Sequence, residues 1–206
     1  MSASLVAELG VQEQLERAGF APVAGVDEAG RGACAGPLVV AAVVLSEDSD
    51  RSVMRDSKAL SPKARERAFD HIMATAESVC VIAVEPAEID RVGIQRADLD
   101  GFRRAVSRLA TPPAFVLTDG YAVQGLPVPS LAVWKGDQVC PAVAAASIVA
   151  KVTRDRTMVE LDAHFPGYRL AAHKGYVTAA HRAALARLGA SAVHRRSFAP
   201  VAEVQR

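Results

Sequence analysis

Apolar positions divide the chain into short β-type runs and longer segments of helical period. Runs rich in valine and other apolar residues predict five strands, over residues 23–27, 38–45, 79–84, 114–120 and 130–137. Apolar residues that recur every three or four positions predict helices over residues 3–18, 62–78, 86–110, 140–165 and 178–188. Two successive strands, followed by strands that alternate with helices, predict an α/β fold with a mixed sheet and flanking helices.

Two local signals refine these helices. Ser61 precedes Pro62, and this pair is typical of an N-cap followed by the first helical position. Gly93 interrupts the helical pattern of residues 86–110, and we expect a break there.

Three of the predicted strands end in acidic residues, which are Asp27 with Glu28, Asp119 and Asp137. A buried carboxylate without a partner costs several kcal/mol, so these side chains need basic partners or a metal. Ligands of α/β sheets gather at strand ends, and carboxylate oxygens without His or Cys suit Mg²⁺ or Mn²⁺. Four carboxylates are enough for two ions about 4 Å apart. The alternative is that these acids only begin turns.

Adjacent strand residues face opposite sides of a sheet. If Asp27 points into the site, Glu28 must therefore turn back at the strand end or bind through its backbone carbonyl. The turn that follows, "GRGACAGP" over residues 30–37, contains three glycines. Glycines without a Cβ let another molecule approach the backbone closely.

The totals indicate one compact domain of 206 residues, with an N-terminal helix over residues 1–19 and the main body over residues 20–202. The net charge of +1 gives no general signal for nucleic acid, but residues 151–206 carry 10 Lys and Arg against 4 Asp and Glu. This basic part either holds a polyanion or is an ordinary solvated surface. Three distant cysteines and the lack of a signal-peptide pattern predict a cytoplasmic protein with reduced thiols, and the lack of a long apolar run predicts no membrane contact. We also expect a monomer.

Seven motifs together resemble the bacterial ribonuclease HII family, the type 2 ribonucleases H. They are "GVDEAGRGACAGP", "DSKALS", "FVLTDG", "VWKGD", "AAASIVAKVTRD", "HKGYVTAAH" and "RRSFAPV", spread in order over roughly residues 20–202. The resemblance implies a ribonuclease H-like fold with a five-stranded mixed sheet. It implies an endoribonuclease that hydrolyses the RNA strand of RNA–DNA hybrids. Such an enzyme also cuts 5′ of single ribonucleotides in duplex DNA, and leaves 5′-phosphate and 3′-hydroxyl ends.

The resemblance also assigns roles to residues. It implies that the catalytic and metal-binding residues, for two Mn²⁺ or Mg²⁺ ions, are Asp27, Glu28, Asp119 and Asp137. It implies that Gly30, Arg31 and Gly32 read the ribose 2′-hydroxyl, which distinguishes RNA from DNA. The ring of Tyr176 is expected to pack on the next sugar, with a core tyrosine as the alternative.

Several other polar or aromatic residues allow more than one interpretation. Lys58 and Lys174 either bind substrate phosphates or are solvated lysines. Arg195 and Arg196 either contact phosphate or form a solvated pair. Lys151 and Arg154 are candidates to neutralise the site carboxylates, whereas Asp155 is expected to form a helix ion pair. We expect a core position for Trp134 and structural roles for His173 and His181.

Three rival functions fit the sequence less well. An exonuclease of the same fold would have no reason for the glycine turn or for Tyr176. A phosphatase with an aspartyl nucleophile would need a second acid two residues after Asp27, where Ala29 stands. A silent hybrid-binding module would not need all four acids.

Overall fold

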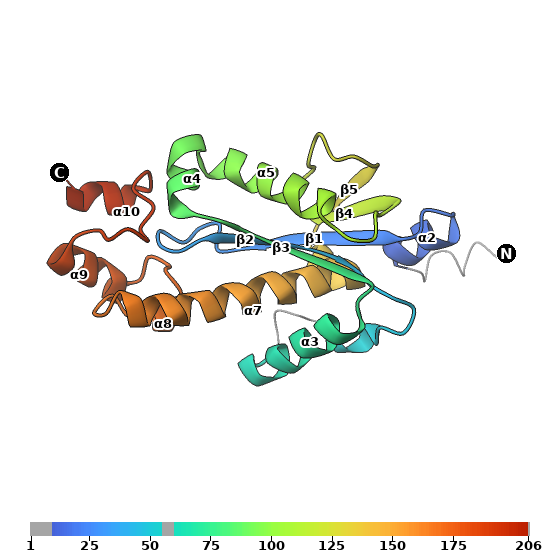
Figure 1. The fold of residues 1–206 in the computed structure, drawn as a ribbon, viewed down its shortest axis with the longest axis horizontal. Coiled ribbons are helices and arrows are strands. Elements are labelled where there is room, and N and C mark those ends of the chain that lie inside the picture. The colour runs from blue at the N-terminus through green and yellow to red at the C-terminus, as the bar shows by residue number, and fades with distance from the viewer. Residues whose placement is uncertain (1–9, 55–59, 206) are drawn as a thin grey trace.

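The computed structural model describes residues 10–54 and 60–205 (Figure 1). Its centre is one five-stranded sheet in the order β3-β2-β1-β4-β5. The neighbours β1–β2 and β2–β3 are antiparallel, and β1–β4 and β4–β5 are parallel. The bounds are β1 Val23–Ala29, β2 Leu38–Val44, β3 Ser78–Val84, β4 Phe115–Asp119 and β5 Ser130–Val133. The predicted mixed sheet is confirmed.

Helices cover both faces of the sheet, as Figure 1 shows. Helices α4 (Pro86–Val92) and α5 (Ile94–Ser107) lie on one face, and α3 (Pro62–Thr75) and α7 (Pro141–His164) lie on the other. Strand β2 explains the arrangement, because all seven of its residues are buried. Val40, Ala42 and Val44 join the core beneath α5, while the alternate residues join the core beneath α7.

Helix α7 lies unusually close to β1 because Gly25 has no side chain. A Cβ at Gly25 would lie 2.0 Å from the carbonyl carbon of Ala142. Real Cβ atoms do not approach backbone this closely, so only glycine permits the contact. The close packing places the polar residues of α7 beside the end of β1.

The local helix signals are confirmed. The Ser61 hydroxyl accepts a hydrogen bond from the backbone N–H of Ala64, and Pro62 begins α3. Gly93, with a φ of +81°, separates α4 from α5. The predicted N-terminal helix is described only in part, as α2 Val11–Arg17, because residues 1–9 lie outside the described residues.

Short helices complete the chain. They are α6 Gly136–Val139, α8 Leu170–His173, α9 Ala179–Leu188 and α10 Ala199–Ala202, with 3-10 turns at Arg51–Met54 and Glu203–Gln205. In Figure 1, α8, α9 and α10 gather at the end of the sheet opposite to α2. We call residues 165–202 the C-terminal lobe. Its core includes Cys34 and Ala35 from the glycine-rich turn, so the lobe supports that turn. Within the described residues, no helix is long and apolar enough to cross a membrane.

Two strand ends differ from the prediction by two or more residues. Strand β1 continues through Glu28 to Ala29, because backbone pairing with β2 extends to Ala29 and Val39. Strand β5 ends at Val133, and Asp137 lies in helix α6 rather than at a strand end. Lys135 adopts a left-handed conformation and turns the chain from the strand into this helix.

Candidate active site

Asp27 and Asp119 lie side by side at the ends of two parallel strands. Val26 of β1 pairs with Thr118 of β4, and each acid is the next residue. Both follow the alternation that faces α7, since Gly25 and Leu117 pack against that helix. Asp27 is 6% exposed and accepts hydrogen bonds from the backbone N–H of Glu28, at 2.7 Å, and from the Ser147 hydroxyl.

Asp137 reaches the same place from helix α6. The backbone N–H of Gly136 donates to Asp119 Oδ1 at 2.7 Å and ties α6 to the end of β4. Burial, together with the negative charges of Asp119 and Asp137, raises the pKa of Asp27 to about 7. The structure therefore brings Asp27, Asp119 and Asp137 into one acidic cluster, although Asp137 does not end a strand.

Glu28 faces the opposite side of the sheet from Asp27. It pairs with Val40 inside the strand, so its side chain does not turn back at a strand end, and binding through its backbone carbonyl stays a prediction. Burial is the main cause that raises the pKa of Glu28 to about 9, and the charges of Asp98 and Asp27 raise it further, while Arg31 lowers it. The charged groups near Glu28 therefore include Asp98 of α5 as well as Asp27 of the acidic cluster.

Asp98 also lies at the site, although the sequence patterns did not predict it. Its carboxylate is buried and forms an ion pair with Arg31, with Nε 2.9 Å from Oδ2. The Tyr121 hydroxyl donates to the same oxygen at 2.6 Å. Asp98 occupies an inward position of α5 among Ala97, Phe102 and other buried residues. An acid on an otherwise apolar helix face is the sequence signal that would have found it.

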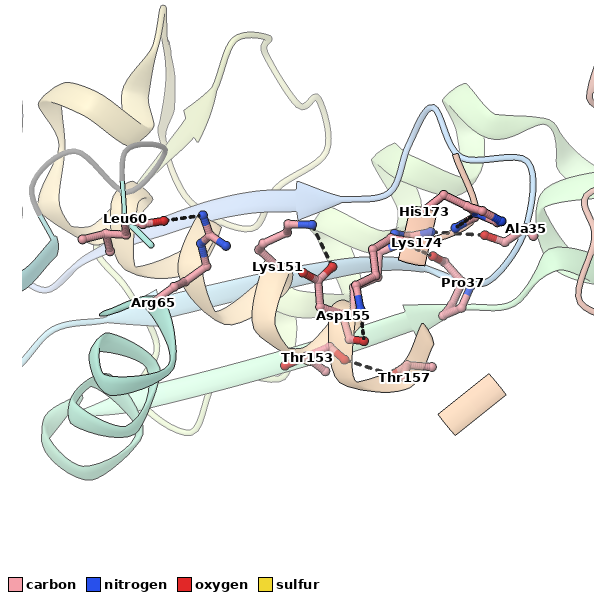
Figure 2. A network of polar contacts seen from close by, with 12 residues as sticks. Ala35, Pro37, Leu60, Arg65, Lys151, Thr153, Asp155, Thr157, His173 and Lys174 are labelled. Atoms are coloured by element: carbon pink, nitrogen blue, oxygen red, sulfur yellow. Dashed lines mark hydrogen bonds and ion pairs between the residues drawn. The ribbon is translucent and has the colours of Figure 1, made fainter. Parts of the chain in front are cut away.

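A cleft of about 360 Å³ lies between the glycine-rich turn, α7, α3 and Tyr176. Four predicted recognition residues line it together with Glu28: Gly30, Arg31, Gly32 and Tyr176. Ser147 and Lys151 contribute from α7, and Arg65, which the sequence analysis missed, contributes from α3. Arg65 also donates to the carbonyl of Leu60 at 3.0 Å (Figure 2).

Of the two predicted phosphate-binding lysines, the structure describes only Lys174. Lys174 is not among the residues that line this cleft, and its Nζ donates to the carbonyl of Asp155 at 3.4 Å (Figure 2). Lys58 lies outside the described residues. Lys151 forms an ion pair with Asp155 at 2.7 Å, so the predicted helix ion pair of Asp155 is confirmed.

Two buried arginines donate hydrogen bonds to backbone carbonyls of the glycine-rich turn. Arg154 of α7 donates to the carbonyls of Ala35 and Pro37, at 3.1 and 3.0 Å. Arg195 donates to the carbonyls of Gly36 and Arg31, at 3.1 and 3.0 Å. Arg154 thus binds backbone carbonyls rather than site carboxylates. The expectations for Arg195 were wrong, because this side chain is fully buried and reaches neither phosphate nor solvent.

The expected core position of Trp134 was also wrong. Its side chain is 79% exposed in the loop between β5 and α6. The strand ends at Val133, so the alternation that would have turned Trp134 inward stops one residue earlier.

Comparison with known proteins agrees with this geometry. The model of the Ribonuclease HII family matches residues 24–201. A Ribonuclease HII of Cutibacterium acnes is 54% identical over 96% of this chain and 98% of its own. A Ribonuclease HII of Acidothermus cellulolyticus is 55% identical over 92% of this chain, but over only 62% of its own length.

A solved structure shares the fold. The ribonuclease H2 of Pyrococcus horikoshii superimposes with a TM-score of 0.77 at 29% identity, over 89% of this chain and 96% of the other. The architecture is therefore the ribonuclease H-like fold. The family match covers most of the chain, and the chain belongs to the ribonuclease HII family.

Proposed function

We propose that this chain is an endoribonuclease that hydrolyses the RNA strand of RNA–DNA hybrids and cuts 5′ of single ribonucleotides in duplex DNA. The observation that carries the proposal is the acidic cluster of Asp27, Asp119 and Asp137 beside a cleft formed by the glycine-rich turn and Tyr176. The acidic cluster suits a reaction centre, and the cleft suits recognition of a sugar. Family membership supports the enzyme class.

The donor set fits divalent metal ions. The residues that would hold them are Asp27, Glu28, Asp119 and Asp137, and their oxygen ligands suit Mn²⁺ or Mg²⁺. Burial, and then repulsion by Asp119 and Asp137, raise the pKa of Asp27, and a bound cation would stabilise its ionised form. Within the described residues, no three acidic, His or Cys side chains converge closely enough to hold an ion as they stand.

Bound ions would activate a water molecule and stabilise the leaving 3′-oxygen, which gives 5′-phosphate and 3′-hydroxyl ends. The protein's own groups orient the acids for this task. The Ser147 hydroxyl and the Glu28 N–H hold the Asp27 carboxylate, and the Gly136 N–H holds that of Asp119. These donors limit the rotation of both side chains toward the cleft.

The glycine-rich turn suits recognition of a 2′-hydroxyl. A Cβ at Gly32 would meet nothing within 4 Å, so the backbone there faces open space. Backbone N–H and C=O groups can pair with a hydroxyl that is both donor and acceptor. The ring of Tyr176, 42% exposed at the cleft, is placed to pack against a neighbouring sugar. Lys151 and Arg65 add positive charge for the phosphates.

Cleavage of a duplex with one embedded ribonucleotide tests the proposal. We expect a cut on the 5′ side of the ribonucleotide with Mn²⁺ or Mg²⁺, none with EDTA, and none of an all-DNA duplex. Asp119→Asn should lose cleavage but keep binding. Metal-independent cleavage, removal of nucleotides from an end, or binding without cleavage by the wild-type protein would each contradict the proposal.

A further inference from the structure

Three histidines of the C-terminal lobe form a buried cluster behind Tyr176. His181 Nε2 lies 3.1 Å from His194 Nε2, and the rings of His173 and His181 stack with centroids 4.2 Å apart. His181 Nδ1 lies 3.0 Å from the carbonyl oxygen of Tyr176. His181 and His194 are almost fully buried, and the proposed reaction uses neither.

The hydrogen-bond partners determine which nitrogen of each ring carries hydrogen. The backbone N–H of Ser191 donates to His194 Nδ1 at 3.1 Å, so this nitrogen is an acceptor. A neutral His194 therefore carries its hydrogen on Nε2 and donates to His181 Nε2. His181 must then carry its hydrogen on Nδ1, where it donates to the Tyr176 carbonyl. The chain of bonds runs in one direction, from Ser191 to Tyr176.

His173 is oriented separately. The N–H of Gly175 donates to its Nδ1 at 3.2 Å, so Nε2 carries the hydrogen and donates to the carbonyl of Tyr168 at 2.8 Å. Burial lowers the pKa of His181, and burial with the neighbouring His181 lowers that of His194 to about 4. Both rings are therefore neutral near pH 7, as the directed chain requires.

We propose that His194 and His181 are positioning residues that fix where Tyr176 enters the cleft. The inference rests on the proposed role of Tyr176 in recognising the substrate. The Tyr176 carbonyl also accepts from Thr178 N–H at 2.9 Å, but that bond lies within the same loop and sets only its local shape. The bond from His181 ties the loop to α9 and, through His194, to the segment that carries the buried Arg195.

Contacts of Arg154 and Gly175 also restrict the position of Tyr176. The Arg154 guanidinium carbon lies 5.5 Å from the centre of the tyrosine ring. Gly175, just before Tyr176, packs so closely on the turn that a Cβ there would lie 2.3 Å from the Ala35 carbonyl oxygen. A shift of the Tyr176 backbone would therefore move the ring relative to the glycine-rich turn that it faces across the cleft.

Nuclear magnetic resonance tests the chain without any substrate. Long-range ¹H–¹⁵N correlations of ¹⁵N-labelled protein at pH 7 should show His194 with hydrogen on Nε2 and His181 with hydrogen on Nδ1. A His194→Gln variant serves to assign the signals. An imidazolium, or the opposite form at either residue, would overturn the directed chain whatever the enzyme cleaves.

Matched variants at His181 test the effect on recognition. His181→Asn keeps an amide N–H near the position of Nδ1, whereas His181→Leu has similar bulk and no donor. We expect His181→Leu to lower the rate on a single embedded ribonucleotide, relative to a long hybrid, by about five- to tenfold. His181→Asn should largely restore the ratio. His164→Leu is the control and should keep the ratio, because His164 is exposed at the end of α7 and lies outside the cluster.

A double-mutant cycle with Tyr176→Ala separates positioning from general stability. If His181 acts through Tyr176, His181→Leu will not change the substrate ratio further in the Tyr176→Ala background. An equal loss on both substrates that follows the fraction of folded protein would overturn the inference. Failure of the wild-type protein to cleave either substrate would instead refute the proposed function, and the resonance experiment would still decide the directed chain.

Discussion

At the residue scale, Asp27 combines a candidate role in catalysis with a cost in stability. Its carboxylate is buried near the charges of Asp119 and Asp137, and its pKa lies far above the usual value. A group whose pKa rises on folding destabilises the folded state when it is ionised. Without metal, Asp27 therefore opposes folding at neutral pH, and removal of its charge should relieve this effect.

Asp27→Asn should accordingly raise the free energy of unfolding, by up to about 4 kcal/mol at pH 8 in EDTA. The amide oxygen can still accept from the Glu28 N–H, so little else is lost. The same variant should have no cleavage activity with Mn²⁺, because it removes a ligand charge. Urea unfolding and the duplex cleavage assay measure the two effects. A variant that is less stable and still active would contradict this account of the cluster.

Trp134 offers a second test of a single residue. Because its side chain is 79% exposed, Trp134→Ala should change the free energy of unfolding by no more than about 0.5 kcal/mol. Phe102→Ala is the matched control, since Phe102 is fully buried and its loss should cost about 3–5 kcal/mol. Denaturation of both variants provides the comparison. Similar large losses would place Trp134 in a packed environment.

At the scale of elements, the glycine-rich turn depends on α7 and on the C-terminal lobe. Arg154 and Arg195 donate to four carbonyls of this turn. Loss of either arginine would leave buried carbonyls without a donor, at about 1–3 kcal/mol for each group. The turn is therefore a rigid surface for a ligand rather than a loose loop.

Two glycines of the turn should respond differently to alanine. A Cβ at Gly30, whose φ is +88°, would lie 1.8 Å from Arg154 Nε, so Gly30→Ala should destabilise the protein by at least about 2 kcal/mol. Gly32→Ala meets open space and should leave stability within about 0.5 kcal/mol. It should still slow cleavage of both substrates, because the added methyl faces the cleft. Thermal unfolding beside the cleavage assay separates the two effects, and unchanged cleavage by Gly32→Ala would exclude a close approach there.

At the scale of the whole molecule, positive charge is concentrated in the last quarter of the chain and at the cleft. Duplex binding should therefore weaken with salt, and each phosphate contact adds about 0.9 to the slope of log K against log salt. Lys151→Met and Arg65→Met should each reduce the slope by about one, because both side chains line the cleft. Arg96→Met is the control, because Arg96 lies on α5 across the sheet from α7. An equal reduction for Arg96→Met would indicate a general charge effect rather than phosphate contacts.

The C-terminal lobe should be sensitive to acid. The pKa of His194 is about 4 in the folded protein and near 6.5 when unfolded, so the unfolded chain binds more protons between these values. Stability should therefore fall as the pH drops from 6.5 to 4, and this contribution should level off below pH 4. Between pH 7 and 4.5, wild type should lose about 2 kcal/mol more than His194→Gln. Equal losses would mean that His194 is not held neutral.

Local patterns in the sequence predicted the main strands and helices and two of the clustered acids. Alternation and helical period predicted the strands and helices, and Ser61, Pro62 and Gly93 acted through their immediate neighbours. Asp27 and Asp119 were recognisable because an acid after a buried apolar run is costly without a partner. These features depend on the residue and a few positions around it.

Only the tertiary structure decided which face each side chain uses and what it meets there. Glu28 shares the face of Asp98, 70 positions away, and Arg154 and Arg195 bind a turn more than 100 positions earlier. Asp137 lies in helix α6 and the Trp134 side chain is exposed to solvent, because β5 ends where its pairing with β4 stops. The sequence determined where these polar groups lie along the chain. Their partners depend on contacts between distant segments, which local periodicity cannot encode.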